Sequence, residues 1–298
     1  MTIEYLTNNN IYRNTVPEGH YDMIIISLIH QGPEMVYYMA MNIKKYVKGK
    51  FIWVAHYNHP TKVDETLLPE WAWLVRDTIK TQTYTRLLSM AVNQALKFAL
   101  DNVTSTNIMT LSSGSAFFRD FILPTYKKIA LNSHEYQLTP NNKLLHIEEI
   151  DINNIGKCVK YLASVGSGGW QYTGCDEDVE FHKLIQNRKF KYFRGCQWSG
   201  QIWPYEVGKE LVEDLSTLKD KIVVRYACEE IYLSTYAYNY AKINNINIDY
   251  VEVIIDWGTE YKIPNINYIQ ILRKYYRDGT AVCRLSDSND EIRQYLLN

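Results

Sequence analysis

The stretch MIIISLI at residues 23–29 decides the fold class of this 298-residue chain. It is a continuous apolar run of strand length, it is rich in β-branched isoleucine, and polar or turn-forming residues bound it on both sides. A strand that is apolar on both faces is typical of the centre of a parallel sheet, because helices cover such a sheet on both sides. The run therefore predicts an α/β protein.

The segments after this run alternate between helix and strand patterns. Pro33 opens the helical stretch PEMVYYMAMNIKKYV, and FIWVA at 51–55 is the next strand. Residues 84–101 carry an amphipathic helical pattern that leads to the short strand NIMTL at 107–111. This order is that of βαβ units, so the first half of the chain predicts a mainly parallel, Rossmann-like sheet flanked by helices.

The second half of the chain is less regular but continues in the same style. Helical patterns begin at Pro204 and near Cys228, and strand patterns and a closing helix follow. Neither an internal repeat nor a flexible linker is visible. We therefore expect a single domain at residues 21–298, preceded by an N-terminal extension at 1–20.

Charge and cysteine content limit the classes of function. Lys and Arg number 32 against 33 Asp and Glu, so the chain lacks the basic footprint of a nucleic-acid-binding protein. The five cysteines are odd in number and widely spaced, which argues against a disulfide framework and a structural zinc site. The N-terminal residues lack the layout of a signal peptide, and no apolar run has the length of a membrane span. We expect a cytoplasmic protein.

Polar residues stand where the predicted parallel strands end. Ligands of open α/β sheets bind in the crevice beyond the carboxyl ends of the strands. His30 and His56 end the first two strands, Asn58 follows the second, and Ser112 and Ser113 follow the strand at 107–111. These residues are candidates for ligand binding, although a histidine at a strand end is more often a surface or hydrogen-bonded residue.

Two further motifs can be interpreted either as ligand-binding sites or as ordinary structural segments. GSGG at 166–169 lacks the remainder of a phosphate-binding loop and is better interpreted as a flexible loop. Asp176-Glu177-Asp178 spells DxD, which binds a divalent metal in many sugar-nucleotide enzymes. The motif also precedes the helical stretch VEFHKLI, where acidic residues suit a helix N-terminus, and we favour that interpretation.

The adjacent glutamates of CEEIYLST, Glu229 and Glu230, differ in helical phase. A helix that begins near Cys228 places Glu230 on the apolar face of Leu233 and Ala237. Glu229 falls on another face, which we expect to be wetter, and the helix dipole explains an acidic residue there. A carboxylate on a buried face has a raised pKa, as a general base requires, so Glu230 is the candidate catalytic residue.

The order and wording of these motifs resemble the core-2/I-branching β-1,6-N-acetylglucosaminyltransferase family. Its first strand reads like "AYLILVH", its second ends in "IHVD", and a "LSGxDxPL" loop follows; here the corresponding stretches are MIIISLIH, FIWVAHYN and LSSGSAFFRDF. Later come "GSQWWxLTREHV", "PDExFFQT" and "FARKF", which resemble GCQWSGQIWPYEVGKELV, CEEIYLST and AVCRLSD. The resemblance spans residues 22–297. It departs from the family where His56-Tyr57-Asn58 replaces the strand-two Asp and where the Arg-Lys pair is reduced to Arg284.

The resemblance implies an inverting glycosyltransferase of GT-A-like fold. Its nucleotide-binding half would be 21–125 and its acceptor and catalytic half 126–298. Glu230 matches the family's general base. The residues that would bind a UDP-sugar, with N-acetylglucosamine as the expected sugar, are His30, His56, Asn58, Ser112, Ser113, Arg284 and a second cation, for which Arg273, Lys262 and Lys274 are candidates. Those that would bind the sugar or the acceptor are Gln197, Trp198 and Glu229; Trp198 is equally well interpreted as a core residue.

The family holds the departing diphosphate with basic side chains, so the resemblance implies no metal cofactor. The implied partners are a UDP-sugar donor and a glycan acceptor, and a membrane-bound acceptor would bring the protein to the inner face of the membrane. Two alternatives stay open. One is a metal-dependent GT-A transferase that uses Asp176 and Asp178, and the other is a non-catalytic protein that binds carbohydrate or nucleotide.

Overall fold

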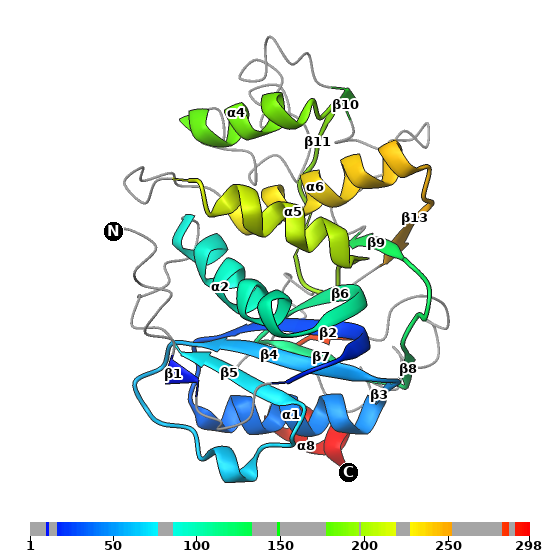
Figure 1. Ribbon diagram of the computed structural model, residues 1–298. Helices are drawn as coiled ribbons and strands as arrows, with labels where there is room; N and C mark the ends of the chain where they lie inside the picture. Colours follow the sequence, from blue (N-terminus) through cyan, green and yellow to red (C-terminus); the bar gives the residue numbers. More distant parts are fainter. Residues whose placement is uncertain are drawn as a thin grey trace, which may run out of the picture.

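A single mixed sheet forms the centre of the protein in the computed structural model, which describes residues 10–11, 17–76, 86–132, 148–149, 177–196, 198–218, 227–251, 282–285 and 290–298. Within these ranges the sheet has eight strands (Figure 1). In order across the sheet they are β1 (Asn10–Ile11), β5 (Ala72–Arg76), β4 (Phe51–Tyr57), β2 (His20–Ile29), β6 (Thr104–Ser112), β12 (Ile202–Pro204), β9 (Ile129–Asn132) and β13 (Ile248–Val251).

The apolar run of the sequence is the central strand, as predicted. β2 pairs in parallel with β4 on one side and with β6 on the other, and β4 pairs in parallel with β5. Residues 23–26 are fully buried, because both faces of β2 are covered. Alternate side chains enter two separate cores: Ile24 and Ile26 lie in one, and Met23 and Ile25 lie in the other.

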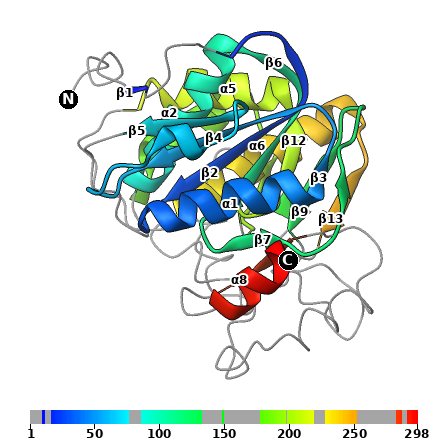
Figure 2. The same ribbon diagram turned by 90° about the horizontal axis from the view of Figure 1, so that it is seen from below.

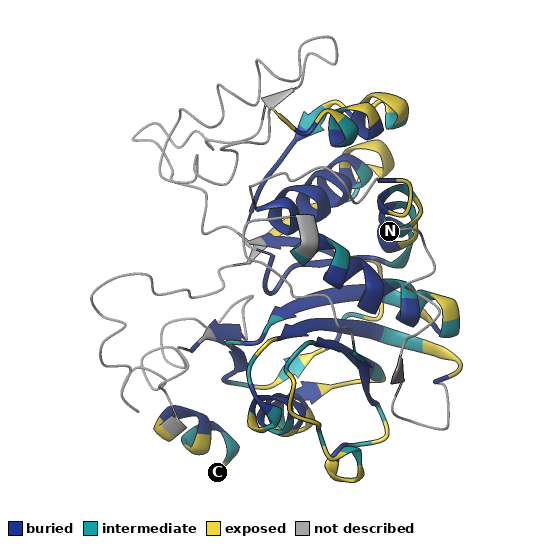
Figure 3. Ribbon diagram, turned by 90° about the vertical axis from the view of Figure 1, so that its left-hand side faces the viewer, coloured by how far each residue is buried: buried dark blue, intermediate teal, exposed yellow. Residues whose placement is uncertain are grey.

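Helices cover both faces of the sheet. α1 (Pro33–Tyr46) and α8 (Asp290–Leu297) lie together on one face (Figure 2). α2 (Arg86–Asn102), α5 (Tyr205–Leu215) and α6 (Cys228–Asn244) lie on the other, and α4 (Val179–Arg188) packs beyond α5 and α6 (Figure 1). Buried residues run from the sheet into α5 and α6, while exposed residues mark the outer faces of the helices (Figure 3). None of the helices in the described ranges has the length and apolarity that crossing a bilayer requires.

The sheet stops being parallel after β6. β12 runs antiparallel to both β6 and β9, with Ile202 opposite Met109 and Ala130, and β13 is parallel to β9. The chain turns directly from β12 into α5, because Pro204 cannot continue the ladder but suits a helix start. The predicted mainly parallel α/β sheet flanked by helices is thus confirmed.

Three two-stranded ladders complete the described structure. β7 (Ser115–Phe117) pairs with β14 (Val282–Arg284), β3 (Val47–Lys48) with β8 (Phe121–Ile122), and β10 (Glu148–Glu149) with β11 (Tyr192–Phe193). A short 3-10 helix, η2, covers Glu65–Leu67. The β7–β14 ladder brings residues 282–284, from the C-terminal part of the chain, close to the end of β6.

Candidate active site

The parallel strands end at one common edge of the sheet. Leu28 of β2 lies opposite both His56 of β4 and Ser112 of β6, so His30, Asn58 and Ser112 emerge close together along this edge. His30 is exposed, and the half-buried Asn58 donates its backbone N–H to the carbonyl of Ile29 at 3.2 Å. The sequence-based placement of these three residues is confirmed, and the edge is where an α/β sheet binds ligands.

His56 lies elsewhere than predicted. Strand β4 continues through Tyr57, so His56 is a strand residue and not a strand end. Its side chain is 1% exposed, and Nε2 lies 3.1 Å from Oε1 of Gln94 on α2. The ladders to β2 and β5 extend the strand, and the imidazole then finds a hydrogen-bond partner in the core. His56 has the same register as Ser112, but the expectation that it follows the end of its strand and presents its side chain at the edge is wrong.

Three serines from separate segments converge at the end of β6. Ser112 donates its backbone N–H to Oγ of Ser199 at 3.1 Å, and Ser115 Oγ lies 2.8 Å from Ser112 Oγ and 2.5 Å from Ser199 Oγ. The neighbouring Ser113 is also buried. Sequence reasoning missed Ser199, since only the antiparallel pairing of β12 with β6 brings its loop to this place.

Arg284 joins the same neighbourhood through its backbone. It lies opposite Ser115 in the β7–β14 ladder, and the next N–H, that of Leu285, donates to the carbonyl of Gly114 at 2.6 Å. A residue 169 positions away in sequence from Ser115 thus lies beside the serine cluster. Two of the predicted ligand-binding residues, Gln197 and Arg273, lie outside the described residues, as do the alternative cations Lys262 and Lys274.

The loop before β12 connects the sheet edge to the N-terminal turn of α6. At the sheet, Gly200 donates to the carbonyl of Thr110 at 2.6 Å, and Thr110 Oγ1 donates to the carbonyl of Trp198. At the helix, the N–H of Cys196 donates to the carbonyl of Glu230 at 3.4 Å, and Cys196 Sγ lies 3.0 Å from Ser234 Oγ. The turn that carries Glu230 is therefore fixed to the loop that also carries Ser199.

Trp198 lies in the core. Its side chain is 7% exposed and belongs to the apolar cluster on the α2, α5 and α6 side of the sheet. Its interpretation as a core residue, which the sequence left open, thus agrees with the structure. Arg194, which sequence reasoning did not single out, is fully buried four residues earlier, with its guanidinium carbon 5.9 Å from the ring centre of Tyr238.

Both glutamates of α6 are buried, which corrects the expectation for Glu229. Glu229 is 5% exposed and Glu230 is 4% exposed. Helical phase does not separate them, because α2, α5, β9 and β11 contact α6 and leave its first three turns no wet face. Burial raises the pKa of Glu229 to about 7, although a hydrogen bond from its own backbone opposes the effect. Glu229 lines a small cavity between α2, α5 and α6.

Asp178 has a structural role. Its side chain accepts the N–H of Phe181 at 3.1 Å and so caps α4, and it also accepts the hydroxyl of Tyr232. Asp178 is completely buried, and α4 lies beyond α5 and α6, on the side away from the sheet (Figure 1). Asp176 lies outside the described residues, and among those described no group of three His, Cys, Asp or Glu side chains is placed to hold a metal ion.

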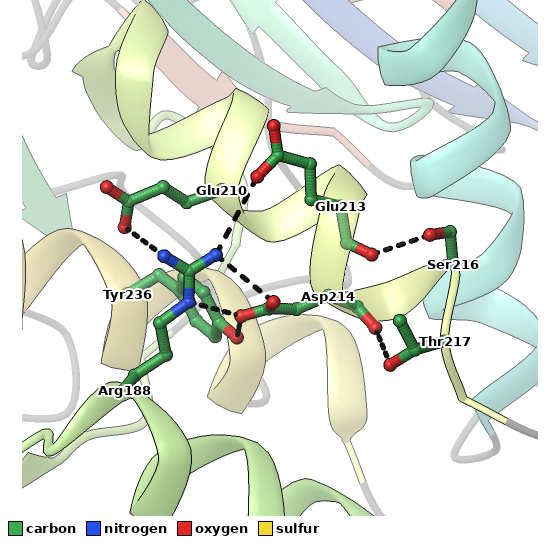
Figure 4. Close-up of polar contacts among 7 residues, drawn as sticks. All are labelled: Arg188, Glu210, Glu213, Asp214, Ser216, Thr217 and Tyr236. Atoms are coloured by element: carbon green, nitrogen blue, oxygen red, sulfur yellow. Dashed lines mark hydrogen bonds and ion pairs between the residues drawn. The ribbon is translucent and has the colours of Figure 1, made fainter.

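A charged cluster around Arg188 fixes α4 to α5 and α6 (Figure 4). The guanidinium donates to both carboxylate oxygens of Asp214, at 2.7 and 3.1 Å, and lies 3.7 Å from Glu210 and 3.8 Å from Glu213. The hydroxyl of Tyr236 also donates to Asp214. Burial raises the pKa of Glu210, and the hydrogen bond to Asp214 raises that of Arg188. These charges pair with one another, so we assign the cluster to stability.

A comparison of the chain with protein-family models found no match, and a comparison with curated protein sequences found none.

Proposed function

We propose that the chain is a metal-independent, inverting glycosyltransferase of GT-A-like fold that transfers a sugar from a UDP-sugar to a hydroxyl of a glycan acceptor. The observation that carries the proposal is the position of Glu230. Its helical turn is hydrogen-bonded through Cys196 to the loop of Ser199, and Ser199 is hydrogen-bonded to the end of β6. The backbone of a buried glutamate is thus linked, through one loop, to the edge where an α/β sheet binds its ligand.

In the proposed reaction Glu230 acts as the general base. It accepts the proton of the acceptor hydroxyl as that oxygen attacks the anomeric carbon, and the bond from this carbon to the β-phosphate oxygen breaks on the opposite face. One displacement inverts the configuration and leaves UDP. Such a step needs one carboxylate base and no carboxylate nucleophile.

The leaving group carries negative charge that the protein has to stabilise. In the proposal Arg284 binds the diphosphate, because a guanidinium is always charged and can donate two hydrogen bonds to phosphate oxygens. The backbone of Arg284 beside Ser115 supports this assignment. Residues 21–125 would supply the nucleotide site, with His30, Asn58 and the serines at the sheet edge, and Arg273 would be the second cation. The residues after 126 would bind the acceptor, with Gln197 at the sugar.

The proposed location is the cytoplasm, with association at the inner face of the membrane where the acceptor is membrane-bound. The metal-dependent alternative is weaker than the proposal, because both oxygens of Asp178 accept hydrogen bonds within the fold.

The test compares two adjacent substitutions, Glu230→Gln and Glu229→Gln, in an assay of UDP release and sugar transfer with UDP-N-acetylglucosamine and other UDP-sugars. Loss of a general base lowers the rate by about 10² to 10⁴, so Glu230→Gln should abolish most turnover, whereas Glu229→Gln should retain far more of it. The reverse order would move the base to Glu229. Loss of activity in excess EDTA would favour the metal-dependent enzyme, and donor binding without turnover would favour a non-catalytic protein.

A further inference from the structure

A small cavity lies between the N-terminal parts of α2 and α6. Its walls are mostly apolar, from Val92, Leu211, Leu215, Tyr232 and Leu233, and its polar lining comes from Ser89 and Asn93 of α2 and Glu229 of α6. The volume of the cavity that the centre of a water molecule can occupy is about 10 Å³. This is close to the smallest space that holds one water, which needs about 10–15 Å³.

The three polar side chains of the cavity share an unusual feature. Oγ of Ser89, Oδ1 of Asn93 and Oε2 of Glu229 are all buried, and none has a hydrogen-bond partner among the described residues. The three side chains therefore do not bond to one another. The residues are 3%, 6% and 5% exposed. A buried polar atom without a partner costs about 1–3 kcal/mol, and three in one cavity indicate a further bound group.

The chemistry of the three atoms selects the ligand. Oδ1 of Asn93 can only accept a hydrogen, Oε2 of Glu229 accepts as a carboxylate oxygen or as the carbonyl oxygen of the neutral acid, and the hydroxyl of Ser89 can donate. We propose that the cavity binds one water molecule that donates to Asn93 and Glu229 and accepts from Ser89. Three hydrogen bonds are the usual number for a buried water. A metal ion would need more oxygen ligands than these three, and a larger ligand would not fit.

The bound water would connect α6 to α2 at the turn next to Glu230. No direct hydrogen bond between Glu229 and Asn93 joins the two helices here. The water thus supplies the missing polar link, and it positions the first turn of α6 without contact with any substrate. This inference does not depend on the proposed reaction.

The first test is a crystal structure of the full chain that resolves ordered water. We expect one water within hydrogen-bond distance of Ser89 Oγ, Asn93 Oδ1 and Glu229 Oε2, and its loss in Asn93→Leu. Direct hydrogen bonds between the side chains, or a density that is not water, would overturn the proposal.

The second test measures coupling in solution through urea unfolding midpoints. The measurement is made near pH 4.5, where Glu229 is neutral in the folded protein and the cost of burying its charge is absent. Asn93→Leu and Glu229→Leu each remove one ligand of the water, so each should lower the midpoint there. The double variant should lower the midpoint by clearly less than the sum of the two single shifts. Once the first substitution has displaced the water, the second residue has no water left to lose. Asn93→Leu combined with Asn244→Leu, at the exposed far end of α6, is the control and should be additive. Additive shifts in both pairs contradict the water bridge.

Discussion

Replacement of Glu229 by Gln should change how the stability of the protein depends on pH. The cavity around Glu229 contains no cation among the described residues, and apart from Glu229 itself its only titratable lining residue is Tyr232. Burial therefore raises the pKa of the carboxyl from an ordinary 4.5 to about 7. Glutamine has nearly the same shape but never ionises, so the substitution removes this titration and little else.

The direction of the effect follows from proton binding. Between pH 4.5 and 7 the folded protein keeps the proton of Glu229 while the unfolded chain has released it, so stability falls as pH rises, by about 1.4 kcal/mol for each pH unit. Above pH 7 the full cost of about 3 kcal/mol is present. Glu229→Gln should therefore be close to wild type near pH 4.5 and gain up to about 3 kcal/mol over it by pH 8.

The assay is equilibrium urea unfolding of wild type and variant at pH 5 and pH 8, at constant ionic strength. At each pH, the free energy of unfolding of the wild type is subtracted from that of the variant. The two differences are then compared, because groups that titrate alike in both proteins cancel. Glu70→Gln, at an exposed position, controls for the loss of one negative charge. If the wild type and Glu229→Gln keep the same difference at both pH values, Glu229 is not a buried neutral acid and the reasoning fails.

Further predictions concern the polar contacts that hold the fold and the site together. Asp214→Ala removes the carboxylate that pairs with Arg188 and accepts from Tyr236, so it should cost about 2–4 kcal/mol in urea unfolding; a cost below 1 kcal/mol would show that the cluster in Figure 4 contributes little. Asn42→Leu removes two hydrogen bonds, of 2.9 and 2.7 Å, between α1 and the backbone of Phe117 in β7. It should destabilise the protein by about 2–4 kcal/mol and weaken UDP binding, since β7 carries Ser115 and pairs with Arg284; unchanged UDP affinity in calorimetry would contradict the link. UDP at 100 times its Kd should stabilise the wild type by about 2.7 kcal/mol, which a thermal-shift assay measures, and no shift with any UDP-sugar would contradict the proposed donor.

The central sheet could be predicted because its signal is local. Residues 23–29, which are apolar except for Ser27, need cover on both faces, and Pro33 begins the helix that supplies part of it. The end of β4 could not be predicted in the same way. His56 and Tyr57 look like the start of a polar loop, but neighbouring strands on both sides continue the ladder through them. Pairing energy across the sheet thus overrode the local pattern.

The two glutamates of α6 show when helical periodicity fails to predict which side chains are exposed. A helical phase argument separates a wet face from a dry one only when one face meets solvent. α6 lies between α2, α5 and the β9 and β11 strands, and its first three turns are buried on all sides. The sequence of α6 contains this information in its composition, since tyrosine and small residues occupy every face, but it does not show which neighbour each side chain meets. The sequence predicts a helix start at Asp178 and the structure confirms it, because an N-cap is a local feature.

The candidate site depends on contacts that no local pattern can reveal. Ser112, Ser199 and Glu230 lie on a strand end, a loop and a helix, and hydrogen bonds donated by backbone N–H groups connect the three segments. Ser234 strengthens the connection, since its hydroxyl donates to the carbonyl of Glu230 at 2.6 Å and lies 3.1 Å from the amide nitrogen of Gln201. A general base has to be held within a fraction of an ångström of its working position. In the proposed mechanism, the polar side chains buried between the loop and the helix would hold the turn of Glu230 in place. This role accounts for Cys196, Gln201 and Ser234 at positions where packing alone would favour apolar residues.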